Sequence, residues 1–137
     1  MASQCLKHFM YITLHCITFF MQIYYCNFML DAVTVEIHNG KTEQEFVKLF
    51  IDDETKQSSQ EVLFDFIANS VAKFIKDRKI TKKLPLGFTF SFPVKQESLI
   101  SGRLIRWTKD FKATGAEGED VVQLLKAAFD RRGVSIQ

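Results

Sequence analysis

The feature that most constrains this chain is an abrupt change in composition between Leu30 and Asp31. Residues 1–30 contain all three cysteines, all four methionines and all three tyrosines, and Lys7 is their only charged residue. The other 33 of the 34 charged residues and the single tryptophan lie from residue 31 onward. Such a change marks a boundary between two kinds of segment. We expect an apolar N-terminal segment over 1–30 and a globular domain over 31–137.

The apolar segment includes a run of 22 residues, 9–30, without a formal charge. A helix of that length would be long enough to cross a bilayer, but His15, Gln22 and Asn27 make the run only moderately apolar. No small-residue cleavage pattern precedes Asp31, which argues against a removed secretory signal. We therefore expect a helix that lies against the domain or in lipid, rather than a further strand of its sheet.

Charge and cysteine content exclude two other classes of function. The net charge is only +2, and no Lys/Arg cluster with interleaved aromatic residues occurs, so nucleic acid is not an expected partner. Three cysteines are an odd number, and their spacings match no zinc pattern. We expect no metal site and no disulfide framework.

The first half of the domain predicts a hairpin and a helix. Val33, Val35 and Ile37 alternate with polar residues, as in a half-buried strand. Asn-Gly at 39–40 favours a two-residue turn, and 45–51 forms the returning strand. A capping box of Ser58 and Glu61 would begin the next helix. Its apolar face would consist of Leu63, Phe66, Ile67, Val71, Phe74 and Ile75.

The second half predicts a strand, a loop and a helix. The apolar run 86–92 is typical of a strand buried on both faces, and Pro93 would end it. Residues 94–118 are expected to form a loop-rich region. A helix over 119–132 would end at Gly133. Strands that alternate with helices indicate an α/β domain with a mixed sheet and flanking helices.

Ligands of open α/β sheets bind beyond the carboxyl ends of strands, which here means just after Phe92. Ser91 offers a hydroxyl there, and the predicted loop can bring Thr108 and Lys109 over the same strand end. These groups suit a polyhydroxylated ligand, since hydroxyls donate and accept and an ammonium stabilises charge on oxygen. A Ser91 that merely ends a strand is the competing interpretation.

Longer motifs at the same place resemble a known family. The segment 86–93 (Leu-Gly-Phe-Thr-Phe-Ser-Phe-Pro), followed by Leu99, Leu104 and Trp107-Thr108-Lys109, is similar to the hexokinase signature. The segments 111–114, 117–125 and 61–67 also resemble the family. The resemblance covers about residues 32–133.

This resemblance implies part of the small lobe of an actin-like ATPase (ribonuclease H-like) fold, preceded by the apolar segment. It implies transfer of the γ-phosphoryl group of ATP, with Mg²⁺, to the 6-hydroxyl of a hexose such as glucose. Ser91, Phe92 and Pro93 would lie at the sugar-contacting strand end, and Thr108 and Lys109 would bind the sugar. The implied location is cytoplasmic, with membrane association through residues 9–30 as the alternative.

Several family features have no counterpart in residues 1–137. The family's Asp-Leu-Gly-Gly-Thr phosphate loop precedes the strand that 33–37 resembles, yet residues 1–30 contain no glycine. The catalytic aspartate of its Asn-Asp-Thr motif is also missing, so no catalytic residue is assigned. Ile100 replaces a small polar residue, and Asp110 replaces a glycine. The chain is thus expected to be an inactive part of a hexokinase or, alternatively, a non-catalytic module that binds a membrane or a partner.

Overall fold

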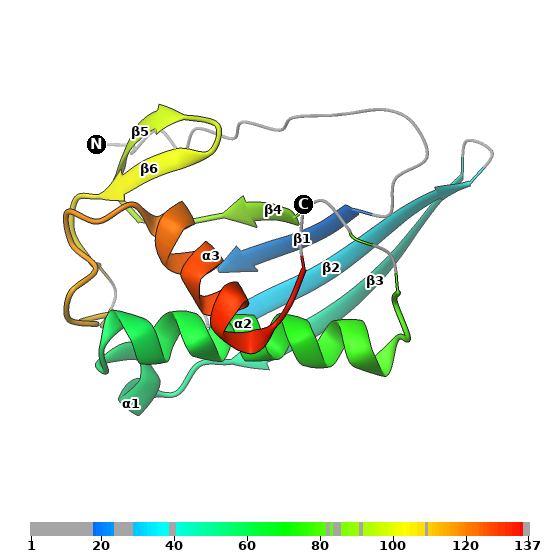
Figure 1. Cartoon of the computed structure of the whole chain (residues 1–137), viewed down its shortest axis with the longest axis horizontal. Coiled ribbons are helices and arrows are strands. Elements are labelled where there is room, and N and C mark those ends of the chain that lie inside the picture. The colour runs from blue at the N-terminus through cyan, green and yellow to red at the C-terminus, as the bar shows by residue number, and fades with distance from the viewer. Residues whose placement is uncertain are drawn as a thin grey trace.

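In the part of the chain that the structure describes, the main sheet has four strands in the order β3-β2-β1-β4 (Figure 1). The computed structural model describes residues 18–23, 29–38, 41–81, 83, 86–90, 92–108 and 110–135, with side chains from Leu49 onward except Thr89. β1 is antiparallel to β2 and parallel to β4, so the sheet is mixed, as predicted. The strands are β1 (Thr18–Ile23), β2 (Met29–His38), β3 (Lys41–Phe50) and β4 (Leu86–Thr89).

The predicted hairpin is confirmed. β2 contains Val33, Val35 and Ile37, and β3 returns antiparallel to it with His38 opposite Lys41. Asn39 and Gly40, to which the turn was assigned, lie outside the described residues. β3 begins earlier than the predicted 45–51, because the polar residues 41–44 continue the ladder.

The helix expected over residues 9–30 is wrong where the structure describes that segment. Thr18–Ile23 is strand β1, which lies between β2 and β4, and β2 already begins at Met29. A run of residues without charges is compatible with a central strand as well as with a helix. Either element can be buried on all sides and can therefore consist of apolar residues throughout. None of the helices in the described part of the chain has the length and apolar character that a membrane crossing requires.

Three helices follow among the described residues, and two of them were predicted. α2 (Gln60–Asp77) and α3 (Val121–Arg132) match the expected segments, and α3 ends at Gly133 in the left-handed conformation (φ 65°). The short α1 (Asp53–Lys56) was missed. The predicted cap of α2 is wrong by one residue, because Ser59 accepts the N–H of Val62, whereas the hydroxyl of Ser58 donates to the Thr55 carbonyl.

Two predictions for the second half need correction. β4 is shorter than 86–92, and it is only half-buried because it lies at the edge of the sheet in the described part of the chain. The segment expected to be a loop over 94–118 contains a hairpin of β5 (Val94–Ser98) and β6 (Ser101–Leu104). β5 is mostly polar and exposed, so it lacks the apolar alternation of a strand.

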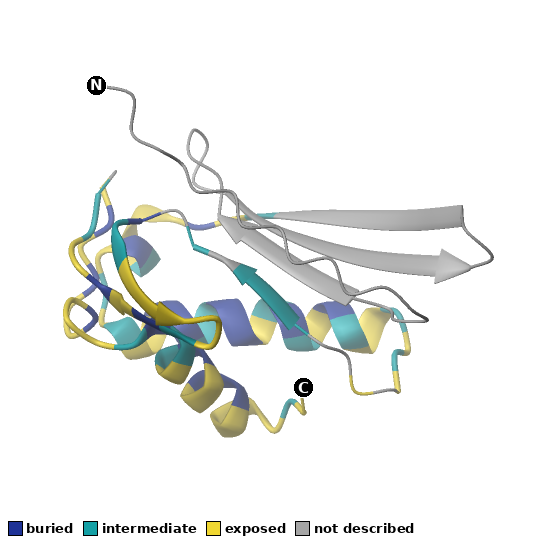
Figure 2. Ribbon diagram, turned by 90° about the horizontal axis from the view of Figure 1, so that it is seen from above, coloured by how far each residue is buried: buried dark blue, intermediate teal, exposed yellow. Residues whose placement is uncertain are grey.

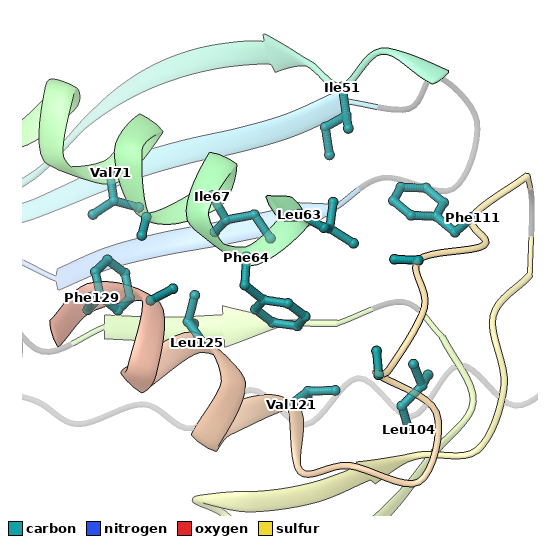
Figure 3. Close-up of a cluster of buried hydrophobic side chains, with 14 of the residues drawn as sticks. Ile51, Leu63, Phe64, Ile67, Val71, Leu104, Phe111, Val121, Leu125 and Phe129 are labelled. Atoms are coloured by element: carbon teal, nitrogen blue, oxygen red, sulfur yellow. The ribbon is translucent and has the colours of Figure 1, made fainter. Parts of the chain in front are cut away.

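The hydrophobic core lies between the sheet and the two long helices, which cover the same side of it (Figures 1 and 2). Figure 3 shows Phe64 of α2 and Leu125 of α3 within one cluster of buried side chains, and both are almost completely buried. At the surface, Arg131 of α3 donates to Asp65 of α2 at 2.7 Å. α3 therefore packs against α2 on the same side of the sheet.

Candidate functional site

Four aromatic rings join the end of β4 to the segment that follows the β5–β6 hairpin. The ring of Phe92 lies 4.9 Å from those of Phe90, Trp107 and Phe111, measured between centroids. Trp107 and Phe111 stack at 5.6 Å with an interplanar angle of 23°. Contacts between aromatic rings in these geometries stabilise a cluster by more than the burial of its apolar surface area alone would. The segment 107–111 is thereby held against the strand end.

Trp107, the only tryptophan, is fixed by two hydrogen bonds. Its backbone N–H donates to Oε1 of Glu117 at 3.0 Å, and its indole Nε1–H donates to the carbonyl of Ala113 at 2.8 Å. A half-buried indole that satisfies its N–H in this way has a defined orientation. Both hydrogen bonds join residues within the segment 107–117, so they hold this segment in a folded conformation.

Backbone hydrogen bonds attach the same segment to the helices. Lys112 donates its N–H to the carbonyl of Lys56 at 3.0 Å, at the end of α1. Thr114 donates to Ser58 at 2.9 Å and accepts the N–H of Gln60 at 2.8 Å. The segment 107–117, which has no regular secondary structure, is therefore anchored at several points.

An open depression of about 610 Å³ lies over this segment, and residues between Trp107 and Glu117 line it. Trp107 and Phe111 contribute aromatic surface, while Thr108 and Thr114 contribute hydroxyls. Asp110, Lys112 and Glu117 add charged groups that are exposed to solvent. An aromatic surface beside hydroxyls and carboxylates suits a small polar ligand that also has apolar C–H groups.

The structure places three of the five predicted site residues. Thr108 is half-buried and lines the depression. Phe92 is buried within the aromatic cluster, and Pro93 accepts the N–H of Ile105 at its carbonyl (2.9 Å). Ser91 and Lys109 lie outside the described residues. Thr108 and the Phe92 strand end are thus brought together, and the sugar contacts of all five stay predictions.

Sequence reasoning missed Trp107, Glu117 and Thr114 as site-forming residues. Trp107 carried a signal, since a lone tryptophan in a polar, apparently irregular segment is unusual. The bond from Trp107 to Glu117 spans ten positions outside any regular element, so no periodicity indicates it. In the described residues, no three His, Cys, Asp or Glu side chains gather as a metal site would require.

Comparisons with known proteins agree on one family. A hexokinase family model matches residues 21–137. Hexokinase-1 of Spinacia oleracea is 46% identical over 101 residues, which are 69% of this chain and 20% of that protein. Hexokinase-1 of Mus musculus is 54% identical over 72 residues, which are 52% of this chain and 7% of that protein.

Solved structures show the same relationship in three dimensions. A hexokinase from Schistosoma mansoni complexed with glucose matches with a TM-score of 0.82 and 31% identity, over 90% of this chain and 28% of that one. The chain therefore spans less than a third of each of these relatives. The predicted fold, a partial actin-like small lobe with mixed helix and sheet, is confirmed by this match. With the family model covering nearly the whole described part, the chain belongs to the hexokinase family.

Proposed function

We propose that this chain forms part of the sugar-binding lobe of a hexokinase that phosphorylates a hexose, glucose in the first instance, at its 6-hydroxyl. The observation that carries this proposal is the anchored segment 107–117, which presents Thr108 beside an aromatic surface at the end of β4. The structural relative from Schistosoma mansoni is described as a complex with glucose. A cytoplasmic location is part of the same proposal.

Each predicted residue has a role in this proposal. Ser91 and Thr108 would exchange hydrogen bonds with sugar hydroxyls, because each hydroxyl both donates and accepts. The Lys109 ammonium would stabilise negative charge that develops on oxygen during phosphoryl transfer. Phe92 and Pro93 would shape the strand end, since Phe92 packs in the aromatic cluster and Pro93 binds the Ile105 N–H through its carbonyl.

The family implies ATP and Mg²⁺, but the residues of this chain do not fit a phosphate loop. Such a loop needs glycines, because the backbone N–H groups must approach the phosphates closely. β1 and β2 are connected by residues 24–28, whose sequence is Tyr-Tyr-Cys-Asn-Phe, and no glycine precedes Gly40. We propose that the isolated chain does not turn ATP over.

The same glycine-free connection favours a second candidate function. A chain of this family without a phosphate loop would act as a non-catalytic module that binds a sugar, a membrane or a protein partner. The two candidates differ in one respect, namely whether this chain works together with the part of a hexokinase that it does not span. A mixing experiment with a chain that supplies that part together with a phosphate loop would separate them, because only the first candidate predicts that turnover appears.

Trp107 provides a direct test of sugar binding, because the only tryptophan lines the depression. We expect glucose to change its fluorescence with a Kd in the millimolar range or weaker, about −4 kcal/mol or less favourable. Thr108→Ala should abolish the response, whereas Thr81→Ala, at an exposed threonine before β4, should keep it. A response that is equal in both variants would contradict the role of Thr108.

A coupled assay tests the proposed inactivity. Purified chain should show no glucose-dependent ATP turnover above the blank. Turnover that disappears in Ser91→Ala or Lys109→Ala would overturn the assignment of an inactive part, and micromolar glucose binding would overturn the expected weak affinity.

A further inference from the structure

Positive charge is concentrated in one short segment at the end of α2. Residues 73–83 contain six of the 18 basic residues but only one of the 16 acidic residues, so the rest of the chain has a net negative charge. We call this segment the basic patch, and the structure describes all of it except Lys82. Figure 1 shows that it lies at the end of α2 that is remote from the β5–β6 hairpin. Its basic residues are Lys73, Lys76, Arg78, Lys79, Lys82 and Lys83.

Most of the described cations in the basic patch are available to a partner. Lys76, Lys79 and Lys83 are exposed, and no hydrogen bond or ion pair ties their ammonium groups to another described residue. Lys73 pairs with Asp77, the only acid of the patch, at 2.6 Å. This hydrogen bond holds the pKa of the Asp77 carboxyl below its usual 3.8, and neighbouring cations lower it further. The one carboxylate therefore stays charged, but it neutralises only one of the cations.

Lys79 occupies a backbone position where a lysine costs stability. It follows Arg78, the C-cap of α2, and its φ is 53°. A left-handed residue at a helix end is most often glycine, and α3 ends in this way at Gly133 with a φ of 65°. A side chain is unfavourable in this conformation because its Cβ crowds the backbone. A costly conformation of this kind is evidence for a role in function.

The helix dipole explains only part of the basic patch. Cations in the last turn of a helix stabilise it, but the effect falls off within that turn. It accounts for Lys76, which lies in the last turn of α2. Lys83 lies well beyond the helix, which ends at Asp77. The cations that follow the helix therefore need another explanation.

The composition of the basic patch fits a membrane surface better than a nucleic acid. Five of its six cations are lysines, whose compact charges suit diffuse attraction to a layer of anionic headgroups. Its only arginine, Arg78, lies 3.7 Å from the centre of the Phe74 ring, and Phe74 is itself buried. The described part of the patch thus exposes no aromatic ring on which a base could stack.

We infer that the basic patch binds anionic phospholipid, so that the domain associates with the surface of a membrane. The segment 107–117 contacts the other end of α2, where Thr114 accepts the N–H of Gln60. A helix of 18 residues separates these two ends by about 27 Å, which leaves the candidate site accessible on a membrane-bound domain. The inference does not rest on the proposed sugar binding. It adds a second surface to the membrane alternative, which the sequence attributed to residues 9–30.

Sedimentation of the full chain with lipid vesicles tests the inference. The chain should bind vesicles of phosphatidylserine and phosphatidylcholine in equal amounts, but not vesicles of phosphatidylcholine alone. Added salt should weaken this binding, because it screens charges that are exposed to solvent. The double substitution Lys76→Gln and Lys79→Gln should lower the vesicle affinity about 25-fold, which is about fivefold for each cation.

Two further variants separate the position of the charges from their number and from folding. Lys95→Gln with Lys126→Gln removes the same charge from exposed positions on β5 and α3, and it should change the affinity by less than about twofold. Lys79→Gly removes one cation together with the unfavourable φ. It should therefore lower the affinity about fivefold and at the same time raise Tm.

Three results would overturn the inference. The first is vesicle binding that does not depend on phosphatidylserine, and the second is an equal loss of affinity in the two double variants. The third is tighter binding to duplex DNA or to polyglutamate than to the mixed vesicles, which would mean that the patch serves a nucleic acid or an acidic protein. A glucose titration bears only on the proposed function, so failure of either proposal can be recognised separately.

Discussion

Ser101 donates its hydroxyl to Oδ2 of Asp120 at 2.6 Å, which joins the β5–β6 hairpin to the first turn of α3. The other carboxylate oxygen of Asp120 caps the helix by accepting the N–H groups of Val122 (2.9 Å) and Gln123 (3.4 Å). One side chain therefore fixes both the start of α3 and the position of the hairpin. The segment 107–117 of the candidate site connects these two elements along the chain.

Replacement of Asp120 should destabilise the domain. Asp120→Ala removes the cap of α3 and the bond from Ser101, and we expect a cost of about 2 kcal/mol in the free energy of unfolding. Urea denaturation would measure it. Asp130→Ala, in the last turn of the same helix, should change stability little, because a carboxylate there opposes the helix dipole. Equal effects of the two variants would contradict the dual role of Asp120.

The same carboxylate should contribute to acid unfolding. Burial alone would raise its pKa, but hydrogen bonds from Ser101, Gly102, Val122 and Gln123 outweigh burial and hold the pKa of Asp120 below its usual 3.8. A lowered folded pKa means that the stabilisation is complete above 3.8 and is lost as the pH falls through the folded pKa. Asp120→Asn keeps a capping residue and removes this titration.

The measurement is the difference in free energy of unfolding between wild type and Asp120→Asn across pH. The difference should be constant above about pH 5 and shrink on acidification, because only the wild type loses a charged hydrogen-bond acceptor. A difference that grows as the pH falls would contradict this prediction, because it would mean that folding raises the pKa of Asp120 and does not lower it.

Gly102 is placed where any side chain would meet its neighbour strand. A Cβ atom there would lie 2.7 Å from Cγ1 of Val94, across the β5–β6 pair. We expect Gly102→Ala to cost about 1–3 kcal/mol through overpacking. Thermal unfolding of the double variant with Val94→Ala provides the check, since removal of Cγ1 should recover part of that loss. A double variant with strictly additive losses would exclude the steric explanation.

Much of the fold was predictable because its local patterns agree with its tertiary structure. The alternation at Val33, Val35 and Ile37 and the spacing of Leu63, Ile67 and Val71 each match the period of the element that forms. The failures have physical causes. The β5–β6 hairpin turns at Leu99 and Ile100, which carry none of the Gly, Pro or Asn signals of a turn.

The candidate site was predictable only in part. Thr108 was found through a motif, and the structure places it on the depression. The anchoring of that segment depends on backbone hydrogen bonds, such as those between Thr114 and Ser58 or Gln60. Backbone hydrogen bonds of this kind cannot be predicted from the residue types that form them. The positive φ of Asp110 (66°) was not predicted either, although Asp110 replaces a glycine of the family and such a turn favours glycine.

The last prediction concerns β1, a strand that was not predicted because it lies within the uncharged N-terminal run. Phe20 lies opposite Val33 on one side and Gly87 on the other, so this strand completes the ladder between β2 and β4. Its amide hydrogens should exchange slowly, because opening them requires separation of the sheet. Phe20→Pro removes one N–H from a central strand, where proline is not tolerated.

We expect Phe20→Pro to abolish cooperative thermal unfolding, whereas Thr81→Pro, at an exposed residue before β4, should retain it. Hydrogen exchange of the wild type gives an independent measure, in which Thr18–Ile23 should be protected longer than the exposed β5. Rapid exchange of β1, together with an unchanged Tm in Phe20→Pro, would mean that the sheet is stable without this strand.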